Sequence, residues 1–257
     1  MNKQTENTLR EWAKEYNTPS FIEKDPISLP HIYKRMGSEL RDIEISAFIT
    51  AWMSYGRREV FIAKAMMLHS IMDNIGGPYA WIMSDEKDKE LSLAPLRELN
   101  KGKRDTCYRF YTYQDYLDLC SRLKSIYTKF DSLEEALSKA EGDNPVEKLQ
   151  ALFAGINGIP ALGKKAACKR LAMFLRWMVR TDGIVDFGIW KKYISPIDLI
   201  IPLDTHVYQT SIKLGLTKRK AADLTTAIEI TEALKTIFPD DPCLGDFSLF
   251  GYGVNQQ

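Results

Sequence analysis

Residues 158–171 read GIPALGKKAACKRL and combine a turn with the start of a helix. Gly158, Pro160 and Gly163 are turn-forming residues, and the Ala-rich apolar stretch that follows them is typical of a helix. The pattern therefore predicts a short hairpin that leads directly into a helix. Backbone N–H groups in the first turn of a helix lack partners within it, and with the positive end of the helix dipole they bind anions. Since lysines flank this turn, a DNA phosphate is the expected ligand, and an ordinary connection between two helices is the alternative.

Positive charge is concentrated in and after this segment. The 257 residues include 35 Lys and Arg against 34 Asp and Glu, and the formal net charge of +1 gives no signal for nucleic acid or membrane. Between Ile159 and Lys192, eight basic residues stand against two acidic ones, which is 8 minus 2, or +6, and leaves −5 for the rest. A basic stripe of this kind predicts contact with a phosphate backbone, and the alternative is a solvated helix face.

The periodicity of apolar residues indicates the fold class. Apolar residues recur at helical spacing along most of the chain, and strict alternation over the length of a strand is rare. We therefore expect an all-α protein with about ten helices. The clearest helices are expected over 42–54, 57–73, 113–127 and 145–153, with another beginning after the capping residues Asp131 and Ser132.

Several classes of protein and site are excluded by what the sequence lacks. No stretch approaches the roughly 20 apolar residues of a membrane span, and the N-terminal residues lack the apolar core of a secretory signal. We therefore expect a soluble, cytoplasmic protein that does not bind a membrane. The four cysteines form no close pair, so reduced, buried thiols are expected rather than a metal site or an iron–sulfur cluster. No metal and no cofactor are predicted.

A second motif lies about forty residues beyond the hairpin. Residues 200–207 read IIPLDTHV, in which Asp204 follows an apolar run and stands where a helix N-cap is expected. Capping alone explains an aspartate at such a position. The interpretation changes when this motif is considered together with the basic hairpin.

Five segments together resemble a known family. PALGKKAA at 160–167 is similar to the hairpin of the helix-hairpin-helix DNA glycosylases, the endonuclease III superfamily, and LDTHV at 203–207 is similar to their aspartate segment. KLGL at 213–216, ISAFITAWMSYG at 45–56 and DFSLFGYG at 246–253 resemble further segments in the same order. Within the superfamily, CKRLAMFLRWMVR at 168–180 and IIPLDTHV resemble an uncharacterised bacterial branch that has no established reaction.

The resemblance implies a fold, a function and a set of site residues. It implies two helical subdomains, approximately 41–165 and approximately 1–40 with 166–257, and a cleft between them that holds the hairpin and Asp204. It also implies a protein that binds double-stranded, damaged DNA, with Lys165 as the nucleophile that attacks C1′ and Asp204 as the group that activates it or stabilises charge on the sugar. DNA contacts are expected from Pro160, Leu162, Gly163, Lys164, Lys169, Arg170, Trp52, Tyr55, Arg57 and His206.

Base extraction is a further requirement of such chemistry. No nucleophile reaches C1′ inside an undistorted duplex, so a side chain must fill the gap that the extruded base leaves. Trp52 and Tyr55 lie where the family places its wedge, and core packing is the alternative for both. Arg57 and Arg58 would contact flanking phosphates.

Three departures from the family pattern bear on the chemistry. Ala161 replaces a hairpin glycine, the spacing from Lys165 to Asp204 is 204 minus 165, or 39 positions, and the cysteine cluster of endonuclease III is missing. In the similar bacterial branch, Lys169 is the lysine of the CKRL motif at 168–171, and a lysine at position 165 is not a fixed feature. Three hypotheses follow: a DNA glycosylase with possible lyase activity, a non-catalytic nucleic-acid-binding protein with the same fold, and a helical scaffold for a protein partner.

Overall fold

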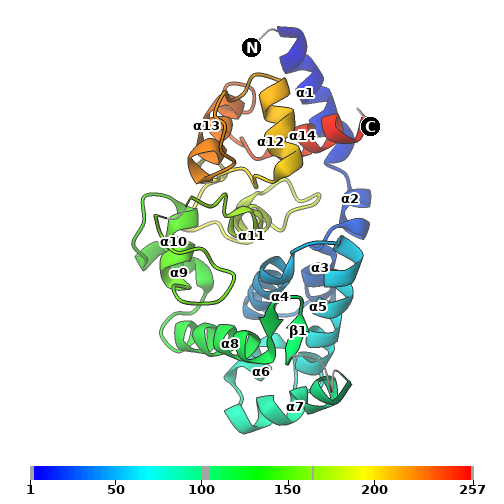
Figure 1. Ribbon diagram of the computed structural model, residues 1–257, viewed down its shortest axis with the longest axis vertical. Coiled ribbons are helices and arrows are strands. Elements are labelled where there is room, and N and C mark those ends of the chain that lie inside the picture. The colour runs from blue at the N-terminus through cyan, green and yellow to red at the C-terminus, as the bar shows by residue number, and fades with distance from the viewer. Residues whose placement is uncertain (1–2, 100–104, 164, 256–257) are drawn as a thin grey trace. The chain divides into compact units, whose positions relative to one another are not determined.

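The computed structural model describes residues 3–99, 105–163 and 165–255, and this part of the chain is predominantly helical (Figure 1). The predicted all-α class is confirmed. The described ranges contain fourteen α-helices, more than the roughly ten predicted, and two of them have only six residues each, which is too little periodic sequence to be recognised. They also contain a small antiparallel sheet of β1 (Thr106–Tyr108) and β2 (Tyr111–Thr112), which was not predicted.

The five helices that the sequence indicated most clearly are present. Their observed bounds are α4 (Leu40–Met53), α5 (Arg58–Asp73), α8 (Tyr113–Tyr127), α9 (Leu133–Lys139) and α10 (Pro145–Leu152). The predicted cap of α9 is also present, since the Ser132 hydroxyl accepts a hydrogen bond from the Glu135 N–H at 3.1 Å. Apolar periodicity and capping residues were therefore sufficient to locate these helices.

The helices form two compact units. The first unit comprises residues 1–25, 141–151 and 160–257, and the second comprises residues 26–140 and 152–159. The second unit contains α4, α5, α8, α9 and the sheet, together with α3 (Ser28–Met36), α6 (Pro78–Met83) and α7 (Glu86–Leu99). The first unit contains most of α10, together with α1 (Lys3–Tyr16), α2 (Pro19–Lys24), α11 (Lys169–Val179), the short 3₁₀ helix η1 (Pro196–Asp198), α12 (Thr205–Lys213), α13 (Leu224–Lys235) and α14 (Leu244–Asn255).

Helix α4 lies at the centre of the second unit. Every residue from Ile43 to Met53 is buried, so the helix has no polar face. The Glu44 carboxylate is buried within it, and accepts hydrogen bonds from the Tyr127 hydroxyl at 2.9 Å and from the Leu133 N–H at 3.1 Å. These bonds satisfy the buried carboxylate and tie α4 to α8 and α9.

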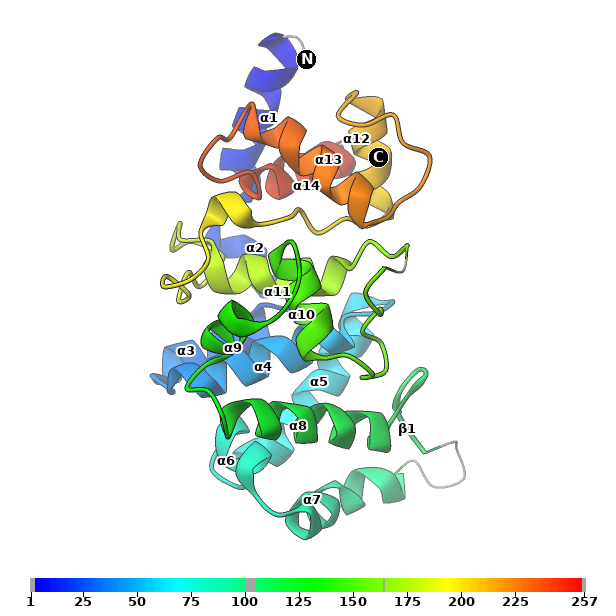
Figure 2. The same cartoon turned by 90° about the vertical axis from the view of Figure 1, so that its left-hand side faces the viewer.

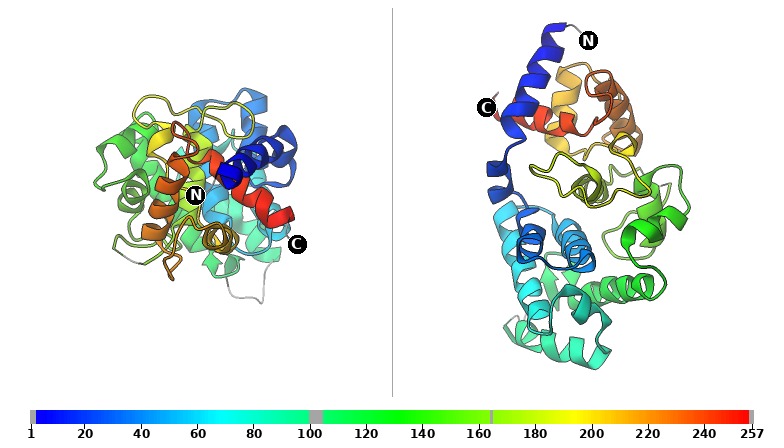
Figure 3. Two further views of the ribbon diagram at one scale, coloured as in Figure 1. Left: turned by 90° about the horizontal axis from the view of Figure 1, so that it is seen from above. Right: turned by 180° about the vertical axis from the view of Figure 1, so that it is seen from behind.

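In the first unit, α14 packs against α1 and α12 (Figures 2 and 3). The Ser248 hydroxyl donates a hydrogen bond to the Leu9 carbonyl at 2.6 Å, and the rings of Trp12 and Tyr252 meet edge to face at 5.0 Å. Gly251 lies against Tyr16, where the absence of a side chain lets the two helices approach closely. The N-terminal helix is thus part of the same core as the C-terminal one.

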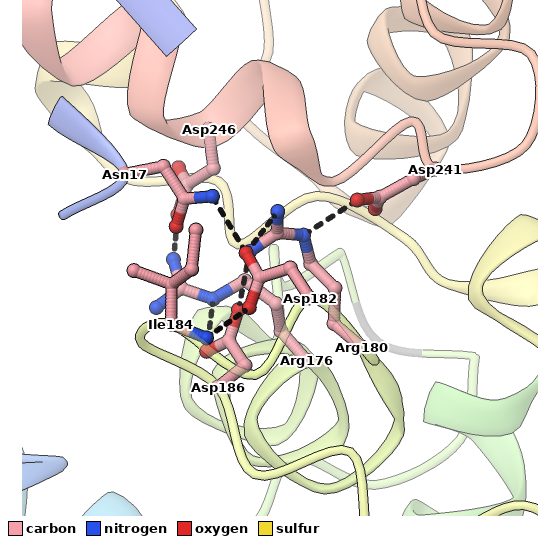
Figure 4. A network of polar contacts seen from close by, with 8 residues as sticks. All are labelled: Asn17, Arg176, Arg180, Asp182, Ile184, Asp186, Asp241 and Asp246. Carbon is pink, nitrogen blue, oxygen red and sulfur yellow. Dashed lines mark hydrogen bonds and ion pairs between the residues drawn. The ribbon is translucent and has the colours of Figure 1, made fainter. Parts of the chain in front are cut away.

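A buried ionic network lies at the C-terminal half of α11 (Figure 4). Arg176 Nε and Arg180 Nη1 donate to the two oxygens of Asp186 at 3.2 Å and 2.8 Å, and all three side chains are buried. Arg180 also binds Asp182 at 2.6 Å and Asp241 at 2.7 Å, and Asn17 donates to Asp182 at 2.6 Å. The network fastens the chain after α11 to the end of α1 and to the segment before α14.

This network corrects the interpretation of the basic stripe. Two of its eight basic residues, Arg176 and Arg180, are turned inward and paired with aspartates. The exposed positive charge therefore does not continue along α11, because the second half of the helix is a core element.

Candidate functional site

The N-termini of α11 and α12 contribute a lysine and an aspartate to one ion pair. Asp204 is the N-cap of α12, and its Oδ1 accepts a hydrogen bond from the Val207 N–H at 2.8 Å. Its Oδ2 accepts a hydrogen bond from Lys169 Nζ at 2.9 Å. Both side chains retain contact with solvent, with exposed fractions of 31% for Asp204 and 44% for Lys169. We call this the Lys169–Asp204 pair.

Its surroundings keep Asp204 ionised. Partial burial raises the pKa of the carboxyl, but the charge of Lys169, the N–H of Val207 and the nearby His206 outweigh that effect, so the pKa lies below its usual value. His206 is exposed in the first turn of α12. An ionised carboxylate that still meets solvent is suited to stabilise positive charge on a substrate or to orient a water molecule.

The hairpin before α11 differs from the prediction in where the helix begins. Residues 165–168 are not helical, and α11 starts only at Lys169, after Cys168 with a φ of 50°. The left-handed backbone at Cys168 ends the hairpin and delays the helix by one turn. As a result Lys165 lies in the connection, exposed and without an ion pair to any described residue, whereas Lys169 occupies the first helical position and reaches Asp204.

The hairpin itself is anchored by α10. The Gln150 side-chain amide donates to the carbonyls of Pro160 at 2.8 Å and Ala161 at 3.3 Å. The positive φ values of the hairpin fall on Gly158, at 82°, and on Gly163, at 74°, and among the described non-glycine residues only Arg109 and Cys168 have a positive φ. Alanine at position 161 is therefore compatible with this hairpin. Leu162 is exposed at the tip, and Lys164 lies outside the described residues.

Cys168 and Arg170 flank Lys169 at the start of α11. Burial raises the pKa of the Cys168 thiol to about 11, although Arg170 lowers it, so the thiol is neutral at physiological pH. All four cysteines are free and buried, as their spacing in the sequence predicts. Among the described residues, no group of His, Cys, Asp and Glu side chains could hold a metal ion.

Asp246 of α14 is a second carboxylate close to the pair, and sequence reasoning missed it as a site residue. Burial raises its pKa to about 6 even though Arg176 donates a hydrogen bond to it, and the charge of Asp204 raises it further while Lys169 lowers it (Figure 4). The DFSLFGYG motif drew attention to this stretch only as a helix. Nothing in a single sequence shows that Asp246 turns toward α11 and α12.

The second unit carries a separate set of candidate residues at the tip of the β1–β2 hairpin. Tyr55 and Phe110 are exposed and meet edge to face at 5.2 Å, and the Arg109 guanidinium lies 5.0 Å from the centre of the Tyr55 ring. The Tyr108 hydroxyl donates a short hydrogen bond to the Tyr55 carbonyl, which fixes the two segments together. We call Tyr55, Arg109 and Phe110 the hairpin-tip cluster.

Of the two aromatic residues named as a wedge, only Tyr55 is at the surface. Trp52 is buried, donates from its indole N–H to the Asn157 carbonyl at 2.8 Å, and packs on Tyr111 at 4.0 Å. Core packing is therefore its role in this structure. Arg57 is largely exposed beside Tyr55, with Glu59 3.8 Å away. Arg109 and Phe110 were missed because two very short strands leave no alternating pattern to detect.

Comparison with known proteins identifies the family. A family model described as "Protein of unknown function (DUF2400)" matches residues 25–255. No curated protein and no solved structure matches the chain. In the part of the chain that the structure describes, none of the helices combines the length and the apolar character needed to cross a membrane.

Proposed function

The chain belongs to the family described as protein of unknown function (DUF2400), and from the geometry of its site we propose that it binds double-stranded DNA and acts as a DNA glycosylase on a damaged base. The observation that carries the proposal is the Lys169–Asp204 pair, which joins a solvent-accessible carboxylate and a lysine 2.9 Å apart directly after a basic hairpin. The resemblance of the hairpin and of LDTHV to the helix-hairpin-helix glycosylases supports the same function.

The proposed reaction breaks the bond between C1′ and the base nitrogen. The electron pair of that bond leaves with the base, and positive charge develops on the sugar, where the Asp204 carboxylate stabilises it. A water molecule then attacks C1′, and the proton that it loses passes to the solvent or to the departing base. With lyase activity, Lys169 first gives up a proton to the solvent or to the departing base, and its neutral amine then bonds to C1′ in place of water as the bond to the base breaks. The amine loses a second proton to the solvent, and cleavage of the C1′–O4′ bond, with O4′ taking up a proton, opens the sugar ring and leaves an imine.

Lys169 suits the lysine role better than Lys165. Among the described lysines, Lys169 is the one that donates a hydrogen bond to Asp204, and a nucleophile needs a base or an orienting group at that distance. Lys165, together with Pro160, Leu162, Gly163 and Arg170, is better placed to contact the phosphate backbone, since these residues surround the hairpin and the start of α11.

The hairpin-tip cluster supports the same proposal from the second unit. Exposed aromatic rings stack on unpaired bases with a gain of about 1 to 3 kcal/mol per base, and arginine adds a charged plane to such a surface. We propose that Tyr55 and Phe110 stack on unpaired bases of the DNA, with Arg57 contacting a phosphate.

Two assays test the proposal. The first is borohydride trapping on a duplex with an abasic site, because reduction captures only an imine. We expect an adduct with the wild type and with Lys165→Ala, and none with Lys169→Ala. The second measures base release from duplexes that carry 8-oxoguanine and other damaged bases, for which Asp204→Asn should lower the rate by roughly 10² to 10³-fold.

Asp204→Asn is also its own folding control. The asparagine side chain retains an oxygen that accepts from the Val207 N–H, so α12 keeps its cap while the charge is lost. Base release without a trapped adduct would restrict the mechanism to attack by water. DNA binding with neither product would replace the glycosylase with the non-catalytic DNA-binding protein, and absence of DNA binding at low salt would leave the helical scaffold.

A further inference from the structure

The connection between α12 and α13 is a basic loop that the proposed site does not use. Residues 214–223 read LGLTKRKAAD, with Lys218, Arg219 and Lys220 in a row and no acidic residue before Asp223. Runs of charge are most often solvated faces of no further consequence. This loop differs because one of its three cations is used to hold the loop in place while the other two face the solvent.

Arg219 is the internal anchor. Its Nη2 donates to both oxygens of Asp223, at 3.2 Å and 3.0 Å, and its Nε donates to the Thr226 hydroxyl at 2.8 Å. Asp223 is in turn the N-cap of α13 and accepts from the Thr226 N–H at 2.9 Å. The backbone N–H of Arg219 donates to the Thr217 hydroxyl at 3.1 Å. The charge of Arg219, the middle residue of the basic run, is therefore paired with Asp223. Hydrogen bonds from both its side chain and its backbone hold it in place.

The flanking lysines remain available for a partner. Lys218 and Lys220 are exposed, and neither has an ion pair with a described residue. Because Arg219 already orders the backbone between them, a ligand that binds both lysines has to order only the two side chains. Two residues of extended chain span at most about 7 Å, so the lysines can meet separate anionic groups of one partner.

A hydrogen bond connects this loop to the helix that carries Asp204. The Tyr208 hydroxyl in the first half of α12 donates to the Arg219 carbonyl at 2.9 Å. In Figure 2 the connection returns alongside α12 before α13 begins. The loop that carries the two lysines is thus bonded to α12, the helix whose N-cap Asp204 belongs to the Lys169–Asp204 pair. All these residues belong to the first unit.

We propose that Lys218 and Lys220 form a second element that contacts phosphates of the DNA backbone. These lysines follow α12 in the chain, whereas the hairpin precedes it. The inference rests on the proposed DNA binding and adds to it a contact that the hairpin motif does not include. A DNA backbone fits the loop because it offers a regular series of phosphates, and ordered lysines gain affinity by releasing the counterions of those phosphates.

The salt dependence of binding tests this inference with the full chain. The binding constant for a labelled undamaged duplex is measured from 50 to 200 mM salt for the wild type, for Lys218→Gln/Lys220→Gln and for Lys129→Gln/Lys139→Gln. The control pair consists of exposed lysines in the second unit and removes the same charge. Loss of two phosphate contacts should reduce the magnitude of the slope of log K against log salt by about 1.8, while the control keeps the wild-type slope.

The outcomes separate this inference from the proposed function. If the wild type binds and the Lys218→Gln/Lys220→Gln variant has the slope and affinity of the control, the loop does not contact DNA and the proposed function stands. If the wild type does not bind duplex DNA at 50 mM salt, both are overturned. Circular dichroism verifies that the variant folds, which is expected because Arg219 and its partners are unchanged.

Discussion

Asp204 combines a structural and a chemical role in one carboxylate. One oxygen caps α12, and the other accepts from Lys169, so the helix fixes the carboxylate in the orientation that the pair requires. Because the cap needs only an acceptor whereas the proposed chemistry needs a charge, asparagine separates the two roles. The same separation is not available at Lys169, whose hydrogen bond and charge are lost together.

The raised pKa of Asp246 makes a prediction about stability. A carboxyl whose pKa is about 6 in the folded protein and about 3.8 in the unfolded chain stabilises the fold while protonated, and that contribution is lost as the pH rises through 6. The Asp246→Asn variant has no carboxyl at this position, so its stability does not fall for this reason as the pH rises. The free energy of unfolding of the variant, minus that of the wild type, should therefore rise between pH 4 and pH 7, by at most about 3 kcal/mol.

Urea unfolding at a series of pH values measures this difference. Asp118→Asn on the exposed face of α8 is a suitable control, because it makes the same substitution at the surface, where the carboxylate accepts a hydrogen bond from the Gln114 side chain at 2.8 Å. A flat curve for Asp246→Asn would mean that the carboxyl titrates normally and that Arg176 compensates fully for its burial.

At the scale of elements, α14 offers a test of how closely two helices pack. A β-carbon at Gly251 would lie 2.4 Å from the Tyr16 ring, which is itself held against Phe250 at 5.6 Å. A β-carbon at Gly253 would meet nothing within 4 Å. Gly251→Ala should destabilise the protein by about 1 to 2 kcal/mol despite the better helix propensity of alanine, since overpacking costs more than the propensity returns.

Gly253→Ala in the same helix should be neutral or stabilise by up to about 1 kcal/mol. Thermal or urea unfolding of the two variants side by side distinguishes packing from propensity, because both replace the same residue type in one helix. Equal stability of the two variants would show that α1 and α14 can separate without loss.

The elements also show where sequence reasoning succeeded and where it failed. Helix α8 was predicted over its full observed range, because the helical spacing of its apolar residues is a local signal. The start of α11 was placed too early, since the Ala-rich residues before Cys168 have a strong helix propensity and only the tertiary structure imposes the left-handed turn there. The β1–β2 hairpin was missed because its strands are shorter than any periodic signal.

At the scale of the whole molecule, the long-range contacts could not be predicted from the sequence alone. The basic residues of α11 were assigned to one surface, but Arg176 and Arg180 find their aspartates up to 70 positions away. The importance of Lys169 over Lys165 likewise depends on where residue 204 lies in space. Composition and local motifs predicted the candidate segments, whereas the choice of residues within each segment required the structure.

The first unit is assembled from three separate stretches of chain, so its stability should depend on the N-terminal helix. Helix α1 contributes the buried Leu9 and Ala13 and the aromatic contact of Trp12 to the surface of α14. Truncating one buried leucine usually costs 2 to 5 kcal/mol, and whole domains are stable by only about 5 to 15 kcal/mol. Deletion of residues 1–16 should therefore lower the stability by roughly 5 kcal/mol and expose the apolar face of α14.

Urea unfolding of the deleted chain, followed by tryptophan fluorescence, measures the loss, and a synthetic peptide of residues 1–16 added in excess should restore part of it by mass action. Leu9→Ala in the full chain should reproduce a large share of the effect, whereas Glu11→Ala on the exposed side of α1 should change the stability by less than about 0.5 kcal/mol. An unchanged unfolding midpoint after the deletion would mean that α14 is stable against α12 alone, and that the contacts of α1 add nothing to the core that positions Asp246.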